Sequence, residues 1–191
     1  MKSVKASPEA AGMEKTMRLF FAVNLPPGVK HCIAENILPL VPNEGWKKVP
    51  EENLHVTLHF LGQLPAEAVE SLRGEAEALK GFKAFEAEIS CAGHFRGNVL
   101  WLGFGKGNEE FSRLNQALQQ AIGTHDPKFH AHITIARNKG AEKKQALAIV
   151  EKIGKEMKAM KIAAKNVELM ESKPGKSGSE YSRLFSIPFT Q

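Results

Sequence analysis

Apolar residues recur along this chain with two different periods, which separate the expected strands from the expected helices. Compact apolar runs and strict alternation predict strands, because side chains two residues apart share one face of a strand. Spacings of three and four residues instead predict amphipathic helices. The expected strands span residues 18–23, 54–61, 85–91, 99–104, 130–137, 161–170 and 181–189. The expected helices span residues 28–41, 65–80, 108–122 and 141–160, and this order of elements favours an α/β or α+β architecture.

The start of the chain lacks either period. Residues 1–16 have little apolar content, so we expect a flexible N-terminal extension there. Residues 17–191 are of the right length for a single domain. Residues 45–52, 93–98 and 172–178 are rich in turn-forming residues and are expected to connect elements.

Composition and charge add few constraints. The formal net charge is +5 and 42% of the residues are hydrophobic, which is ordinary for a globular protein and compatible with a polyanionic partner. The two cysteines, Cys32 and Cys91, form neither a disulfide framework nor a paired metal motif. Because the sequence has no apolar run of membrane-spanning length and no signal-peptide pattern, we expect a cytoplasmic protein with no membrane partner.

Two short segments are near copies of each other and carry the strongest functional signal. His55-Val56-Thr57-Leu58 and His132-Ile133-Thr134-Ile135 each place a histidine and a threonine two residues apart, within an expected strand. Each strand therefore presents an imidazole and a hydroxyl on one face and aliphatic side chains on the other. A single such tripeptide is most often structural, so the duplication carries the argument.

The paired segments suit acid–base chemistry at a phosphate. One histidine can take a proton from an attacking hydroxyl while the other gives a proton to the leaving oxygen. The threonine hydroxyls can donate hydrogen bonds to phosphate oxygens as charge develops there. This chemistry requires no metal and no cofactor.

Metal binding is the main competing chemistry for these strands. His55 and His59, and likewise His130 and His132, are spaced so that each pair shares a strand face. Neither strand contains the carboxylate or cysteine ligands that usually complete such a site. We therefore expect no metal.

The same residues resemble the two-histidine phosphoesterase superfamily, and within it the RNA 2′,3′-cyclic phosphodiesterase or 2′–5′ RNA ligase family. The similarity runs from Met17 to Phe189. Its markers are the strand at residues 18–23, the Asn-Leu-His to Phe-Leu-Gly block at residues 53–62, and the second motif at residues 132–137. The segment at residues 169–172, followed by Tyr181, resembles the ending of the family.

The resemblance implies a bilobal α+β fold, with two antiparallel sheets facing a central cleft and helices outside. It also implies a metal-independent enzyme that opens a terminal 2′,3′-cyclic phosphate of RNA to a 2′-phosphate, with 2′–5′ ligation as the reverse reaction. By matching position, His55 and His132 are the acid and the base, and Thr57 and Thr134 hold the phosphate. We expect His55 to protonate the leaving oxygen, although the near symmetry of the motifs leaves the opposite assignment open.

Secondary site candidates follow less directly. His59, four residues after His55, should face the same pocket, at a position where relatives often carry Arg. His130 is a further candidate for substrate binding, and Ala131 after it stands where Pro is common. Arg137 reaches the cleft only if its strand bulges, since parity places it opposite His132. The remaining candidates are three aromatic side chains that could stack on a base, although each could equally belong to the core: Trp46, Phe129 and Tyr181.

The expected partner is RNA with 2′,3′-cyclic phosphate ends, including tRNA fragments, bound by a monomer. Two rival interpretations stay open at this point. One keeps the mechanism but acts on a small cyclic nucleotide or a 2′–5′ oligonucleotide. The other is an RNA- or nucleotide-binding module that uses the same cleft without turnover.

Overall fold

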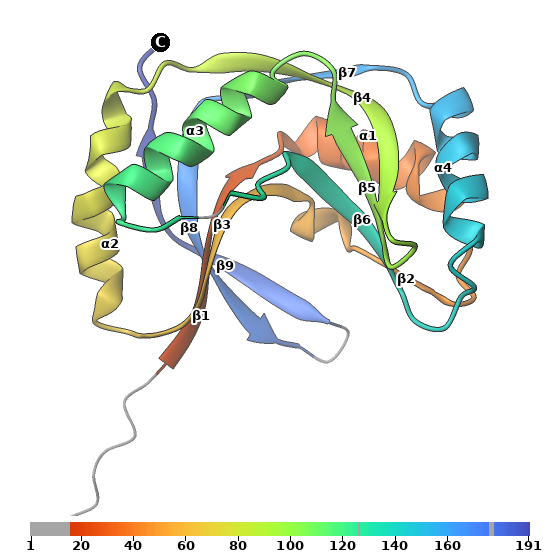
Figure 1. The fold of residues 1–191 in the computed structure, drawn as a ribbon, viewed down its shortest axis with the longest axis horizontal. Coiled ribbons are helices and arrows are strands. Elements are labelled where there is room, and N and C mark those ends of the chain that lie inside the picture. The colour runs from red at the N-terminus through yellow and green to blue at the C-terminus, as the bar shows by residue number, and fades with distance from the viewer. Residues whose placement is uncertain (1–15, 126, 176–177) are drawn as a thin grey trace, which may run out of the picture.

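The computed structural model describes residues 16–125, 127–175 and 178–191. Within them the chain forms one curled antiparallel sheet with four α-helices outside it (Figure 1). The strands are β1 (Thr16–Asn24), β2 (Trp46–Lys48), β3 (His55–Pro65), β4 (Phe85–Phe95), β5 (Val99–Phe104), β6 (His132–Asn138), β7 (Met160–Ala164), β8 (Asn166–Pro174) and β9 (Ser179–Pro188). The helices are α1 (Pro27–Asn36), α2 (Ala68–Ala76), α3 (Asn108–Ala121) and α4 (Gln145–Glu156).

The sheet has two wings that meet at one point. Its strand order is β7-β4-β5-β6-β3-β1-β8-β9, so β4 to β7 make one wing while β1, β3, β8 and β9 make the other. The wings join where β3 and β6 pair, and the only residues in register there, among those described, are Val56 and Ile133. The two sheets expected from the resemblance are therefore two halves of one hydrogen-bonded sheet.

The cleft opens because β3 and β6 pair over so short a length. β6 pairs with β3 at Ile133, and a few residues later it pairs with β2 through Lys48, Lys47 and Trp46. On its other edge β3 pairs with β1 along its whole length, so beyond Val56 it has only this one partner among the described strands. The two motif strands thus diverge from a shared starting point, and their histidines and threonines lie at that point.

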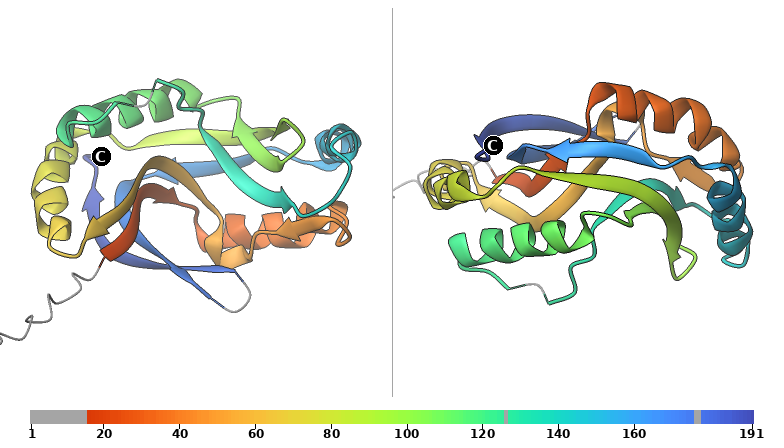
Figure 2. Two further views of the ribbon diagram at one scale, coloured as in Figure 1. Left: turned by 60° about the horizontal axis from the view of Figure 1, so that its bottom comes forward. Right: turned by 90° about the horizontal axis from the view of Figure 1, so that it is seen from above.

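The helices cover the outer faces of the two wings. Helices α2 and α3 pack on β3, and α4 packs on β4 at the opposite end of the molecule (Figures 1 and 2). One continuous apolar core lies between helices and sheet and includes fully buried residues from both wings and from α3, among them Phe21, Val56, Ile133 and Leu114. Burying this apolar surface is the main favourable contribution to folding.

Several expected elements differ in their boundaries. The helix predicted over residues 28–41 ends at Asn36 and continues as a 3-10 turn (Leu38–Leu40), because Pro39 has no N–H with which to extend an α-helix. Likewise α2 begins at Ala68 and passes into a 3-10 turn (Glu77–Gly81). The strand predicted over residues 161–170 is two strands, β7 and β8, which are separated at Lys165.

Two expected connections contain more strand than the sequence indicated. β4 runs on to Phe95 and turns into β5 through Arg96 and Gly97, both with positive φ, as in the tight hairpin turn that fits the strand twist. The loop expected at residues 45–52 contains β2 and a 3-10 turn (Glu51–Asn53). The expected N-terminal extension lies almost wholly outside the described residues, which start at Thr16, the first residue of β1. Among the residues that the structure describes, every helix is too short or too polar to span a lipid bilayer.

Candidate active site where the two wings meet

The four motif residues surround the single pair that joins the wings. Val56 and Ile133 are fully buried on the helix side of the sheet, so their neighbours in each strand face the cleft. Because the strands are antiparallel, His55 lies beside Thr134, and Thr57 lies beside His132. Each histidine therefore has one threonine on its own strand and a second across the ladder.

Both histidines are held by the same local hydrogen bond. Nδ1 of His55 lies 2.7 Å from the carbonyl oxygen of Asn53, and Nδ1 of His132 lies 2.7 Å from that of His130. A carbonyl only accepts, so each Nδ1 must carry the proton and donate. In a neutral ring Nε2 is then the basic atom. His55 Nε2 lies 2.9 Å from the Thr57 hydroxyl, which donates to it.

Burial favours the neutral form of both rings. The pKa of His55 is lowered to about 4, chiefly by desolvation; the hydrogen bond to Asn53 opposes this shift, and the positive charge of Lys30 contributes to it. Desolvation also lowers the pKa of His132. The hydrogen bond to the carbonyl of His130 opposes this shift, and the positive charges of His130 and Arg137 contribute to it. Near neutral pH, in the absence of substrate, both motif histidines are therefore bases.

A bulge in β3 decides which side chains enter the cleft after the first motif. Phe21 of β1 pairs with His59, but the next residue, Ala22, pairs with Thr57, so Leu58 is an extra residue in the ladder. Phe60, which pairs with Phe20, lines the cleft. His59 shares the opposite face with the buried Phe21, and the expectation that it faces the pocket is wrong, because the bulge inverts the alternation.

A matching bulge in β6 brings Arg137 into the cleft. Trp101 of β5 pairs with Thr134, whereas Leu100 pairs with Ala136, so Ile135 is the extra residue. Ile135 and Ala136 are both fully buried, which is the burial pattern of a bulge. Arg137 accordingly faces the same side as Thr134 and lines the cleft.

Three of the four motif residues, His55, Thr57 and Thr134, line a cavity of about 470 Å³ together with Phe60 and Arg137. His132 lies outside this lining, and its ring packs edge-on against Phe95 with centroids 4.9 Å apart. Arg18 and Arg137 are its charged residues, and no Asp or Glu is among the lining residues of the described chain. The ring of Tyr181 packs edge-on against His55 with centroids 5.3 Å apart, and Phe60 stacks on Phe20 at 5.4 Å. A small cavity with two guanidinium groups, hydroxyls and aromatic walls suits a phosphate attached to an organic group.

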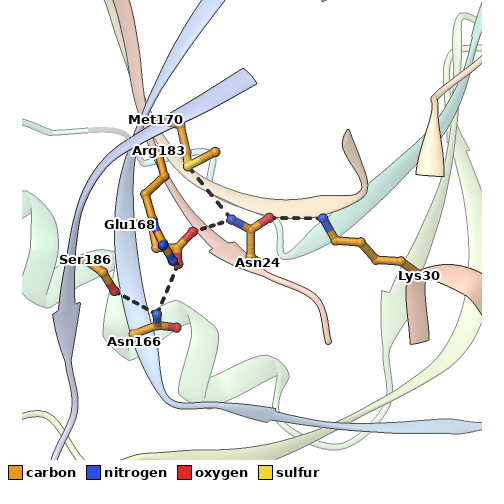
Figure 3. A network of polar contacts seen from close by, with 7 residues as sticks. All are labelled: Asn24, Lys30, Asn166, Glu168, Met170, Arg183 and Ser186. Atoms are coloured by element: carbon orange, nitrogen blue, oxygen red, sulfur yellow. Dashed lines mark hydrogen bonds and ion pairs between the residues drawn. The ribbon is translucent and has the colours of Figure 1, made fainter. Parts of the chain in front are cut away.

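His55 also borders another hollow, whose lining includes part of a network of polar side chains. Figure 3 shows this network. At its centre is the buried carboxylate of Glu168, which accepts hydrogen bonds from Asn24, from Asn166 at 3.2 Å and from Arg183 at 3.1 Å. Asn24 is the cross-strand neighbour of His55, and its Oδ1 accepts a hydrogen bond from Lys30.

Lys30 links this network to the segment that holds His55. Its ammonium group also donates to the carbonyl oxygen of Glu52 at 2.7 Å, in the 3-10 turn that ends at Asn53. Burial lowers the pKa of Lys30, against the opposing effect of nearby carboxylates, of which Glu168 is the strongest. The network thus fixes a cation close to His55.

A family model described as the 2′-5′ RNA ligase superfamily matches residues 35–175, which include both motif strands and the cleft. The chain belongs to this superfamily. Curated relatives agree: the chain is 29% identical over 150 residues to an RNA 2′,3′-cyclic phosphodiesterase of Aeropyrum pernix, covering 74% of this chain and 85% of that protein. It is 34% identical over 139 residues to a Thermus thermophilus protein of the same name, covering 64% and 69% of the two chains.

Solved structures of the superfamily confirm the α+β fold. The crystal structure of Escherichia coli LigT in complex with phosphate superposes with a TM-score of 0.74 at 26% sequence identity, covering 93% of this chain and 99% of that one. The family resemblance drawn from the sequence is therefore confirmed, together with the fold that it implied.

The structure separates the secondary candidates. Tyr181 lies in the cleft beside His55. Trp46 is only 4% exposed and belongs to the core, so it offers no stacking surface. Phe129 lines a separate surface hollow beyond α3. His130 contributes through its carbonyl, and its ring packs on Trp101 at 4.9 Å outside the cleft lining.

Sequence reasoning missed several cleft residues. Asn53 holds His55 through its carbonyl and donates through its side chain to the carbonyl of Ser179 at 2.7 Å, tying the first motif to β9. Its place two residues before the histidine, within the Asn-Leu-His block, was an available signal. Phe60 carried no such signal, because its place in the cleft depends on the bulge of β3. Arg18 lies in β1 next to the buried Leu19, so alternation along that strand was an available signal for its face. In the described chain, no three His, Cys, Asp or Glu side chains are grouped so as to hold a metal ion.

Proposed function

We propose that this protein hydrolyses the terminal 2′,3′-cyclic phosphate of RNA to a 2′-phosphate. The observation that carries the proposal is the arrangement of His55, Thr57, His132 and Thr134 around one cross-strand pair, with both Nδ1 atoms held by carbonyls. The relatives named RNA 2′,3′-cyclic phosphodiesterase support the choice of substrate.

In this mechanism each histidine takes up or releases a proton at Nε2, while its Nδ1 keeps the proton that it donates to a backbone carbonyl. His132 takes a proton from water as the water oxygen attacks phosphorus, and the bond from phosphorus to the 3′ oxygen breaks. His55, protonated at Nε2, gives its proton to that oxygen, leaving a free 3′-hydroxyl and a 2′-phosphate. Each transfer is worth about 10²- to 10⁴-fold in rate. Because the pKa of His55 is lowered when the site is empty, the ring is neutral before substrate binds. The negative charge of the bound substrate then raises this pKa and favours the imidazolium that acts as the acid.

Three groups hold the phosphate in this proposal. The hydroxyls of Thr57 and Thr134 approach it from the two wings, and Arg137 supplies a permanent positive charge at the cavity wall. The guanidinium can donate two parallel hydrogen bonds to phosphate oxygens. Such donors are already in place before charge develops, which is the main source of electrostatic catalysis.

The remaining parts of the proposal concern partner, assembly and location. All four motif residues come from one chain, which supports a monomer acting on RNA ends such as those of cleaved tRNA. Cys32 and Cys91 are both free, which supports a reducing cytoplasm. Run in reverse with an RNA 5′-hydroxyl in place of water, the same site would form a 2′–5′ linkage.

The test is to incubate an RNA ending in a 2′,3′-cyclic phosphate with the protein in EDTA and to identify the terminal phosphate. We expect a 2′-phosphate, lost in His55→Ala and in His132→Ala but retained in the control His125→Ala, whose ring is exposed away from the cleft. Binding of the RNA without formation of product would reject the proposal that the protein is an enzyme. Activity lost in EDTA and restored by a divalent ion would reject the mechanism.

A second substrate tests which histidine is the acid. If the 3′ oxygen is replaced by sulfur, the leaving group is a thiolate, which needs no proton because its pKa is far below that of an alcohol. His55→Ala should then recover most of its lost rate, while His132→Ala should stay slow. Recovery of His132→Ala instead would exchange the two roles.

A further inference from the structure

The catalytic cavity continues on one side into a second hollow, which we call the basic groove. It is lined by residues of β2 and of the segment after it, by the end of β6, and by the facing ends of β8 and β9. Five residues line both the cavity and the groove: Val49, Asn53, Arg137, Ser179 and Tyr181. The groove has a volume of about 330 Å³, at the lower end for sites that hold small organic ligands.

The lining of the groove is positively charged. Lys47, Lys48, Arg137 and Lys139 line it, and the described lining contains no Asp or Glu. None of these three lysines forms an ion pair with a carboxylate of the described chain. Their charge is therefore available to a ligand.

The register of β2 and β6 brings two of these cations together. Lys47 and Arg137 are direct cross-strand partners. Like charges placed opposite each other in an antiparallel pair are destabilising. An anion bound between them would relieve that repulsion, so the arrangement favours a phosphate or similar group at this point.

The hollow on the other side of His55 has a different character. It contains the carboxylates of Glu52 and Glu168 together with the cations Lys30 and Arg183. A polyanion leaving the catalytic cavity would meet both charges there, but only positive charge in the basic groove. The charge pattern therefore selects one exit for an RNA strand.

We propose that the basic groove binds the backbone phosphates of the RNA strand immediately 5′ to the cyclic phosphate. An oligonucleotide end is then a better substrate than a free cyclic mononucleotide, which reaches only the catalytic cavity. This inference rests on the proposed function, since it takes the catalytic cavity as the place of the cyclic phosphate.

The experiment compares two substrates, a 2′,3′-cyclic mononucleotide and a five-nucleotide RNA ending in a 2′,3′-cyclic phosphate. For the wild type we expect a higher kcat/KM with the RNA, falling steeply with salt. Lys47→Ala combined with Lys139→Ala should lower kcat/KM for the RNA about 2- to 30-fold, as expected for the loss of two exposed ion pairs. Turnover of the mononucleotide should stay unchanged, which also shows that the variant is folded.

A charge-matched control and a binding measurement complete the design. Lys152→Ala combined with Lys155→Ala removes the same charge from an exposed face of α4 and should leave both substrates unaffected. For a fluorescent five-nucleotide RNA ending in a 2′-phosphate, the groove variant should lower the slope of log Kd against log salt by about 1.4, or roughly 0.7 per lost phosphate contact.

The outcomes separate the groove from the proposed function. Equal losses of kcat/KM for both substrates, or an equal loss in the α4 control, would overturn the proposal that the groove binds RNA. If the wild type turns over neither substrate, the proposed function fails. The groove then stands or falls on the binding slopes alone, and equal slopes for the groove and control variants would reject it.

Discussion

The lowered pKa of His55 makes a quantitative prediction about stability as a function of pH. The folded-state pKa of about 4 lies below the ordinary value of 6.5, so protonation favours the unfolded chain. The stability that depends on a neutral His55 is fully present above pH 6.5 and is lost as the pH falls towards 4. At about 1.4 kcal/mol per unit of pKa, the complete loss is about 3 kcal/mol. Between pH 7.5 and pH 5 it is about 2 kcal/mol.

Urea unfolding followed by circular dichroism at these two pH values measures the effect. The substitution His55→Asn removes the titrating group, so its free energy of unfolding should fall by about 2 kcal/mol less than that of the wild type between pH 7.5 and pH 5. His125→Asn, at an exposed ring, should behave as the wild type does. Equal falls for the wild type and His55→Asn would refute the argument that burial of this ring opposes its protonation.

Three further predictions concern the surroundings of the site. Lys30→Met removes a positive charge that lowers the pKa of the β3 motif histidine, so an NMR titration should show that pKa moving upward; an unchanged midpoint would contradict the proximity. Thr57→Val keeps the branched shape but removes the hydroxyl, and hydrolysis of cyclic-phosphate RNA should slow by about 10-fold or more, with Tm nearly unchanged. Gly93→Ala drives a methyl group into the indole of Trp101 and should cost about 1–3 kcal/mol in urea unfolding, whereas Gly74→Ala, in an open helical position, should be neutral or stabilising.

The sequence predicted the centre of the site better than its edge. His55 and Thr57, like His132 and Thr134, are two residues apart in uninterrupted strand, so simple alternation places each pair on one face. Four and five residues after each histidine, alternation no longer predicts the face, because both strands bulge directly after the motif threonine. The fifth residue, Phe60 or Arg137, enters the cleft in place of the fourth.

No local pattern marked these bulges. Leu58 and Ile135 are aliphatic residues that fit a regular strand as well as a bulge. That each is an extra residue in its ladder becomes visible only in the pairing of β3 with β1 and of β6 with β5, strands that are distant in sequence. The single joined sheet was unpredictable for the same reason, because it depends on one pair of residues from strands far apart in the chain.

The shared core beneath the two wings has a consequence for how the molecule unfolds. The near-duplicate motifs suggest two equivalent halves, yet the buried apolar cluster is continuous from α2 and α3 through the sheet to α4. Neither half can bury its apolar surface without the other, so the halves form one cooperative unit. The acid and the base of the proposed reaction are thus lost together on denaturation, and a partly unfolded molecule that keeps one wing would have no catalytic pair.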